Sequence, residues 1–129
     1  MKYVVDTGVL SLFYAGDERV RPFFGRIQAG RASGYMSSVN LAEFYYKACQ
    51  KLGKETATVR FHQSKTILEA VETDGELAMA AGLNKCRYGD LSLADAFAAA
   101  LAERLGGTLL TTDEAMLKVA GVRVKHFPV

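Results

Sequence analysis

The stretch Tyr3-Val4-Val5-Asp6-Thr7-Gly8 decides the fold class of this chain. A short apolar run that is closed by turn-forming residues is typical of a strand buried on both faces, as in a parallel sheet. The run ends in an aspartate, so we expect this strand to carry a carboxylate at its carboxyl end.

Strands and helices are predicted to alternate along the rest of the chain. Further strands are predicted at 34–37, 70–71, 108–111 and 122–127. Helices are predicted at 9–16, 17–30, 40–53, 55–68, 76–86 with an interruption at Gly82, 92–105 and 114–119. Because no linker or repeat divides the 129 residues, we expect a single α/β domain over residues 1–129, with a mostly parallel central sheet flanked by helices.

Composition indicates an ordinary globular protein. A chain of this length buries about two-thirds of the surface of its unfolded form, so its core needs no disulfides. Cys49 and Cys86 have neither CxxC nor metal-finger spacing and are expected to be reduced. Asp6 interrupts the apolar start, and no apolar run approaches the roughly 20 residues that span a bilayer. We therefore expect a soluble, cytoplasmic protein that has no membrane partner.

Four acids are predicted to meet at one edge of the sheet. Asp6 ends the first strand, Glu43 lies in the first helical turn after the second, Asp95 begins the helix leading into the fourth, and Asp113 follows the fourth. The carboxyl ends of parallel strands share an edge, where ligands bind. Crowded carboxylates usually imply a cation, and all-oxygen ligation favours Mg²⁺ or Mn²⁺ over zinc.

Helix capping is an alternative explanation for three of these acids. Glu43 and Asp95 follow Asn40 and Ser92 with capping-box spacing, and Asp113 is placed to cap the short helix after it. Acids are favoured at helix starts in any case. Capping does not readily explain an aspartate that closes an apolar strand, and it does not predict that all four acids share one edge.

Four ordered motifs carry a resemblance to a known family. They are Val5-Asp6-Thr7-Gly8-Val9-Leu10, Asn40-Leu41-Ala42-Glu43, Ser92-Leu93-Ala94-Asp95-Ala96 and Leu110-Thr111-Thr112-Asp113. In this order and at these separations they resemble the PIN-domain nucleases, and within them the small VapC-like ribonuclease toxins of toxin–antitoxin modules. The resemblance covers the whole chain.

The resemblance implies a metal-dependent endoribonuclease, the toxin of a toxin–antitoxin pair. It implies that Asp6, Glu43, Asp95 and Asp113 bind Mg²⁺ or Mn²⁺ and act in catalysis, with a bound water attacking the RNA phosphodiester. Thr7 and Thr111 would be polar supports. A homodimer and a cognate antitoxin, with a segment in the acidic cleft, are implied as well.

Two positions near the motifs do not fit the resemblance cleanly. Gly8 stands where the family usually has Asn or Ser, which removes a possible side-chain contact at that corner. Glu114 is the only candidate for a further acid after the last motif, and it has no assigned role.

Charge is distributed unevenly along the chain. Residues 19–65 carry nine lysines and arginines against two glutamates, a balance of +7, whereas residues 66–118 carry four against nine acids, a balance of −5. The basic segment is suited to the phosphates of RNA, and Tyr45 or Tyr46 to stacking on an unpaired base. Ordinary solvated helix faces and core-packed tyrosines are the alternatives.

Two other classes of function remain open from the sequence. A phospho-accepting signalling domain is also a small α/β unit with acids at strand ends, but Asp6 stands alone where such a domain has paired acids. A binding module with a vestigial nuclease site is the second. RNA cleavage that depends on a metal would separate a nuclease from both.

Overall fold

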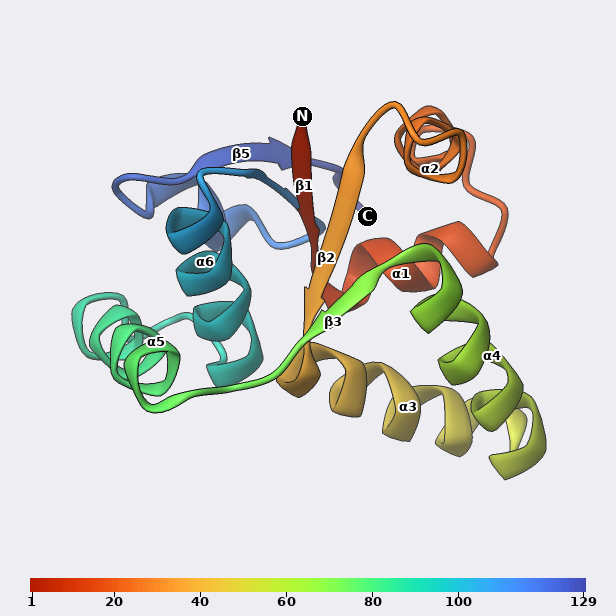
Figure 1. Cartoon of the computed structure of the whole chain (residues 1–129). Coiled ribbons are helices and arrows are strands. Elements are labelled where there is room, and N and C mark those ends of the chain that lie inside the picture. The colour runs from red at the N-terminus through yellow and green to blue at the C-terminus, as the bar shows by residue number, and fades with distance from the viewer.

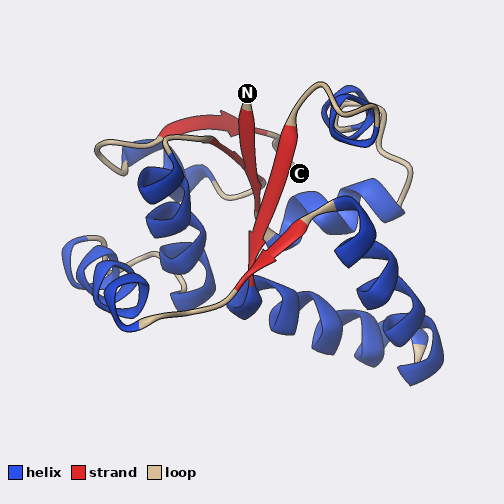
Figure 2. Cartoon of the chain, viewed as in Figure 1, coloured by secondary structure: helices blue, strands red, loops and turns tan.

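The computed structural model describes residues 1–129 as one sheet with helices on both sides (Figures 1 and 2). The strands are β1 (Lys2–Val5), β2 (Ser33–Ser37), β3 (Glu69–Val71), β4 (Thr108–Thr111) and β5 (Arg123–His126). They form a five-stranded sheet in the order β3-β2-β1-β4-β5, and every neighbouring pair is parallel. The predicted α/β fold is confirmed.

Each predicted helix is present, with some shifts at its ends. The helices are α1 (Thr7–Tyr14), α2 (Arg21–Gln28), α3 (Ser38–Leu52), α4 (Lys54–Ile67), α5 (Gly75–Arg87), α6 (Leu93–Leu105) and the 3₁₀ helix η1 (Glu114–Lys118). The prediction that α2 begins near Asp17 is wrong, because the Asp17 carboxylate accepts a hydrogen bond from the Arg19 amide (2.8 Å) and holds a turn there. The predicted interruption at Gly82 is also wrong, since α5 runs through it. None of the helices has the length and apolar character needed to span a membrane.

The sheet separates two apolar layers, and the first strand contributes to both. Val4 packs with α5 and α6, whereas Tyr3 and Val5 pack with α1 and α2. Figure 1 shows α5 and α6 on one side of the sheet and α1 to α4 on the other. The continuous apolar run at residues 3–5 is therefore buried on both faces, as its sequence indicates.

The strand order places a topological switch between β1 and β4. The chain runs from β1 outward to β2 and β3, then crosses back to β4 on the other side of β1. In open parallel sheets the crevice at such a switch, outside the carboxyl ends of the strands, is where ligands bind. The crevice here lies between the residues that follow Val5 and those that follow Thr111.

A buried amide joins the two helices that border this crevice. The Asn40 side chain in α3 donates to the Thr7 hydroxyl in α1 (Nδ2 to Oγ1, 3.3 Å) and accepts from Ser37 Oγ (2.5 Å). The Thr7 hydroxyl donates in turn to the Asn40 backbone carbonyl (3.2 Å). All three residues are buried, so water cannot replace these bonds.

We expect Asn40→Ala to destabilise the protein by about 1–3 kcal/mol, because it removes two buried hydrogen bonds and leaves the Ser37 hydroxyl without its acceptor. Urea unfolding at neutral pH measures this change. Gln50→Ala, at an exposed position of the same helix, is the control and should change stability by less than about 0.5 kcal/mol. Equal effects of the two substitutions would contradict the proposed linking role of Asn40.

Candidate active site

Asp6 is buried at the carboxyl end of β1 and is held from two sides. Its Oδ1 accepts from the Val9 amide in α1 (2.8 Å), and its Oδ2 accepts from the Thr111 hydroxyl and the Thr112 amide (3.2 Å). Asp6 is thus the N-cap of α1, and the expectation that capping does not apply to it is wrong. Burial raises the pKa of Asp6 above its usual range, and the three hydrogen bonds oppose that rise only in part.

Asp113 and Asp95 also lie at helix starts. Asp113 Oδ1 accepts from the Ala115 amide (2.9 Å) and caps η1, while the Asp113 amide donates to Thr111 Oγ1 (3.0 Å). Asp95 lies in the first turn of α6, and its amide donates to Ser92 Oγ (3.1 Å) as the sequence predicts. Neither Asp113 Oδ2 nor the Asp95 carboxylate receives a backbone hydrogen bond, so these oxygens face the cavity without a backbone donor.

Glu43 does not occupy the helical position that its motif predicts. α3 begins at Ser38, and its N-cap is Ser37, whose Oγ accepts from the Asn40 amide (3.1 Å). Asn40 is therefore inside the helix, and Glu43 lies a turn further along than a capping box requires. The Glu43 carboxylate is 3.9 Å from Lys47 Nζ, one helical turn on.

The structure brings all four predicted acids to one cavity of about 420 Å³, which has no hydrophobic residue in its wall. The wall is formed by Asp6, Thr7, Gly8, Ser11, Glu43, Lys47, Lys51, Ser92, Asp95, Thr112 and Asp113. Neither His62 nor His126 belongs to it. Lys47 and Lys51 were not singled out from the sequence, although their spacing of four and eight residues from Glu43 puts all three on one side of a helix.

The acids of this cavity influence one another's charge. Partial burial, interaction with the Asp113 carboxyl and the nearby charge of Asp6 together raise the pKa of Asp95 to about 7. The Ser92 hydroxyl acts in the opposite direction and does not cancel the rise. Near neutral pH the cavity therefore holds carboxylates whose mutual repulsion a cation would relieve.

The donor set fits a hard divalent cation. The chain has no group of three or more His, Cys, Asp or Glu side chains arranged to hold a metal ion directly. Mg²⁺ does not need one, because it usually keeps several waters and is bound through only one or two carboxylates. A wall of carboxylates and hydroxyls around a polar cavity suits such partly hydrated binding.

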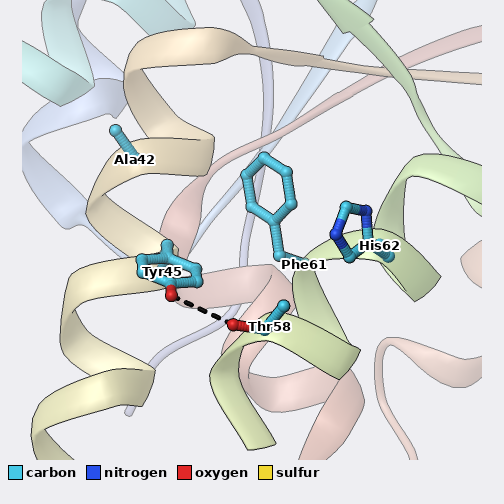
Figure 3. Close-up of a pocket in the computed structure, with 5 residues that line it drawn as sticks. All are labelled: Ala42, Tyr45, Thr58, Phe61 and His62. Atoms are coloured by element: carbon cyan, nitrogen blue, oxygen red, sulfur yellow. Dashed lines mark hydrogen bonds between the residues drawn. The ribbon is translucent and has the colours of Figure 1, made fainter. Parts of the chain in front are cut away.

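A second cavity of about 420 Å³ lies between α3 and α4 (Figure 3). Tyr45 lines it, with its ring edge-on to Phe61 (5.8 Å between centroids) and its hydroxyl 3.0 Å from Thr58 Oγ1. Tyr45 is thus engaged in packing the two helices together. Tyr46 is 48% exposed and has no such partner, so it is the better of the two predicted candidates for stacking on a base.

Comparison with known proteins assigns the family. The model of the PIN domain family matches residues 3–122. This chain belongs to the PIN domain family. The family match agrees with the observed parallel sheet and with the four motifs that suggested the resemblance.

Solved structures share this PIN fold along nearly the whole chain. A chain of the DNA-bound VapBC from Salmonella typhimurium has a TM-score of 0.79 at 20% identity and covers 98% of each chain. VapBC2 from Rickettsia felis has a TM-score of 0.77 at 17% identity, covering 98% of this chain and 99% of the other. Mycobacterium tuberculosis VapC20, described as a sarcin–ricin loop cleaving toxin, has a TM-score of 0.69 at 19% identity, covering 94% and 98%. Among curated proteins, a sequence search finds no significant match.

The raised pKa of Asp95 predicts how the stability of this PIN domain depends on pH. The folded pKa of about 7 exceeds the unfolded value of 3.8, so the folded protein binds more protons between about pH 4 and 7. Stability without metal should therefore fall as pH rises through this window. We expect Asp95→Asn to stabilise the protein in chelator at pH 8 by about 1–2 kcal/mol, a value reduced for solvent screening of a half-exposed group.

Thermal melts at pH 4 and pH 8 measure this effect, which should vanish at pH 4. Glu76→Gln is the matched control, because Glu76 lies in the first turn of α5 outside the cavity. If Asp95 only favours a helix start, its substitution would instead destabilise the protein by about 0.3–1 kcal/mol at pH 8, like the control.

Proposed function

We propose that this PIN domain is a metal-dependent endoribonuclease and the toxin of a toxin–antitoxin pair. The observation that carries the proposal is the single polar cavity into which Asp6, Glu43, Asp95 and Asp113 converge at the topological switch of the sheet. The raised pKa of Asp95 adds support, because it results from partial burial of this carboxyl beside the Asp113 and Asp6 carboxyls, and strongly shifted pKa values cluster at functional sites.

The proposed chemistry assigns a role to each acid. Asp6, Asp95 and Asp113 would hold Mg²⁺ or Mn²⁺ directly or through water, and Glu43 would hold a second ion or orient a water. When bound, the ion lowers the pKa of a coordinated water and neutralises charge on the phosphoryl oxygens. The chain itself fixes Asp6 through Thr111 and two backbone amides, so this carboxylate is preorganised.

RNA is the substrate that the charge distribution favours. Several arginines of the 19–65 segment contact other side chains of the protein. Arg19 forms an ion pair with Asp17, the Arg26 guanidinium lies over the Phe23 ring, and that of Arg60 lies over Tyr14. Lys47 and Lys51 are the only cations in the wall of the acidic cavity. They would contact phosphates of an RNA strand whose scissile bond lies at the acids.

The solved neighbours support a protein partner. The similar structures from Salmonella typhimurium and Rickettsia felis are VapBC complexes bound to DNA, the latter to a fragment from their promoter. We infer a cognate antitoxin that covers the acidic cavity, a homodimeric toxin, and action in the cytoplasm. A small DNA-binding protein encoded by an adjacent, overlapping reading frame is the observation that would identify the partner.

Membership of the PIN domain family disfavours a phospho-accepting signalling domain. A cleavage assay distinguishes a nuclease from the other alternative, a binding module. A binding module with a vestigial site would retain RNA or protein affinity without metal-dependent cleavage. The fully polar wall and the intact set of four acids favour a working nuclease over a vestigial one.

We expect the purified protein to cleave single-stranded or loop RNA with Mg²⁺ or Mn²⁺ and to lose this activity in EDTA. Asp6→Asn should lower the cleavage rate by about 100-fold or more, because it removes a charge from the reaction centre while asparagine still caps α1. Gel-based cleavage assays with a labelled RNA measure both effects.

The control for this assay is Asp90→Asn, which alters an exposed acid that pairs with Lys118 outside the cavity. It should cleave RNA at the wild-type rate. Undiminished cleavage in excess EDTA, or by a folded Asp6→Asn variant, would contradict the proposed metal mechanism.

The cavity lysines should determine much of the salt dependence of RNA binding. In an Asp6→Asn background that does not cleave, Lys51→Gln should reduce the slope of log affinity against log salt by about 0.7 on single-stranded RNA. Lys54→Gln, which lies outside the cavity at the start of α4, should leave the slope unchanged. Fluorescence anisotropy over a salt series gives the slopes, and equal slopes for wild type, Lys47→Gln and Lys51→Gln would remove these lysines from the RNA path.

A further inference from the structure

Gly8 and Thr112 approach each other closely in the wall of the acidic cavity. A Cβ atom added to Gly8 would lie 2.0 Å from Thr112 Oγ1 and 3.0 Å from both Thr112 Cβ and Cγ2. The φ angle of Gly8 is not positive, so its backbone conformation does not require glycine. A side chain at position 8 would instead have to displace the Thr112 side chain, which occupies the space where it would begin.

The Thr112 hydroxyl differs from the other hydroxyls of the cavity wall. Thr7 and Ser11 donate to backbone carbonyls (3.2 and 3.1 Å), and Ser92 accepts from the amide of Asp95 (3.1 Å). Thr112 Oγ1 has no hydrogen-bond partner in the protein. It is the one hydroxyl in the wall that neither donates to nor accepts from another group of the protein, so both its hydrogen and its lone pairs are available to a ligand.

The backbone of Thr112 is held in place on both sides. Its amide donates to Asp6 Oδ2 (3.2 Å), and its carbonyl is 3.3 Å from His126 Nε2. The next residue, Asp113, caps η1. The backbone that carries the free hydroxyl is therefore held between Asp6 and Asp113.

We propose that Thr112 donates a hydrogen bond to a phosphate oxygen of bound RNA, and that Gly8 is retained to make room for this hydroxyl. The inference rests on the proposed nuclease function. An incoming phosphate meets four carboxylates. The donors in the wall that can oppose this repulsion are Lys47 and Lys51 on α3, the Ser92 hydroxyl before α6, and Thr112 at the sheet edge, of which Thr112 follows directly on β4.

The pair also accounts for the unusual glycine in the first motif. Position 8 lacks the Asn or Ser that the resemblance leads one to expect, so α1 offers no polar side chain there. The Thr112 hydroxyl reaches the same place from the end of β4, within 2.0 Å of where a residue 8 side chain would start. A polar group at this corner is thus supplied by a different segment of the chain.

The first test removes the hydroxyl with little change of shape. Thr112→Val should lower kcat/KM for RNA cleavage about tenfold or more, the effect of losing a hydrogen bond to a charged oxygen, while Thr112→Ser stays within about twofold of wild type. In an Asp95→Asn background, Thr112→Val should likewise weaken affinity for uncleaved single-stranded RNA, and Thr112→Ser should weaken it less. Thermal midpoints separate these effects from unfolding, and Thr112→Ala serves if the valine variant does not fold.

The second test examines the link between the two residues. Gly8→Ala should displace the Thr112 side chain and match Thr112→Val in its loss of kcat/KM, and the double variant should be no worse than either single one. Gly82→Ala is the matched control, because this helical glycine has open space around its Cβ position and lies outside the cavity. It should keep wild-type activity.

The possible outcomes distinguish failure of the phosphate contact, of the role of Gly8 and of the nuclease function. Wild-type kcat/KM and affinity in Thr112→Val would overturn the phosphate contact while leaving the nuclease function intact, and additive losses in the double variant would overturn the role of Gly8. A wild type that binds RNA through Thr112 but does not cleave it would refute the nuclease function and support the contact. A wild type that binds no RNA would overturn both.

Discussion

The buried carboxylate of Asp6 is the interaction on which the rest of the site depends. It accepts hydrogen bonds from α1 through Val9 and from the end of β4 through Thr111 and Thr112, and so joins the two segments on either side of the topological switch. Burial disfavours its charged form, and these donors offset that effect only in part. Asp113 takes its place from the same connection, because its amide donates to the Thr111 hydroxyl.

Clustering Asp6, Asp95 and Asp113 in one cavity forms a binding site but is expected to lower the stability of the metal-free protein. The raised pKa of Asp95, which comes from its burial beside Asp113 and Asp6, predicts that its charged form weakens the metal-free fold near neutral pH. Under the proposed function, a cation that binds only the folded state would relieve this repulsion and stabilise the protein. The preorganised acids are held by the stable core beneath them, where Val5 and Leu110 pair between β1 and β4.

The fold and the location of the acids could be predicted from sequence, but their local surroundings could not. The strand at residues 3–5 and the aspartate at its end can be predicted from a short apolar run in the sequence, without knowledge of tertiary contacts. The sequence predicts that α3 begins at Asn40, whereas the helix begins at Ser38 with Ser37 as its N-cap. Ser37 and Asn40 both have a residue three positions later that fits a cap, and the contact that distinguishes them, between Asn40 and Thr7, is not visible in the sequence. The close contact between Gly8 in α1 and Thr112 after β4 brings together residues far apart in the sequence, so neither segment alone indicates it.

Capping and metal binding are not competing explanations for the acids of this cavity. Asp6 and Asp113 are themselves the N-caps of α1 and η1, and the Ser92 cap of α6 places Asp95 in the first turn of that helix. All three helix starts contribute to the wall of the acidic cavity. Asp113 caps η1 with Oδ1 and leaves Oδ2 without a protein donor, so one side chain can serve both purposes. The backbone geometry that places helix starts at the edge of a parallel sheet therefore also gathers the acids, and it is their number at one switch point, more than any single residue, that indicates catalysis.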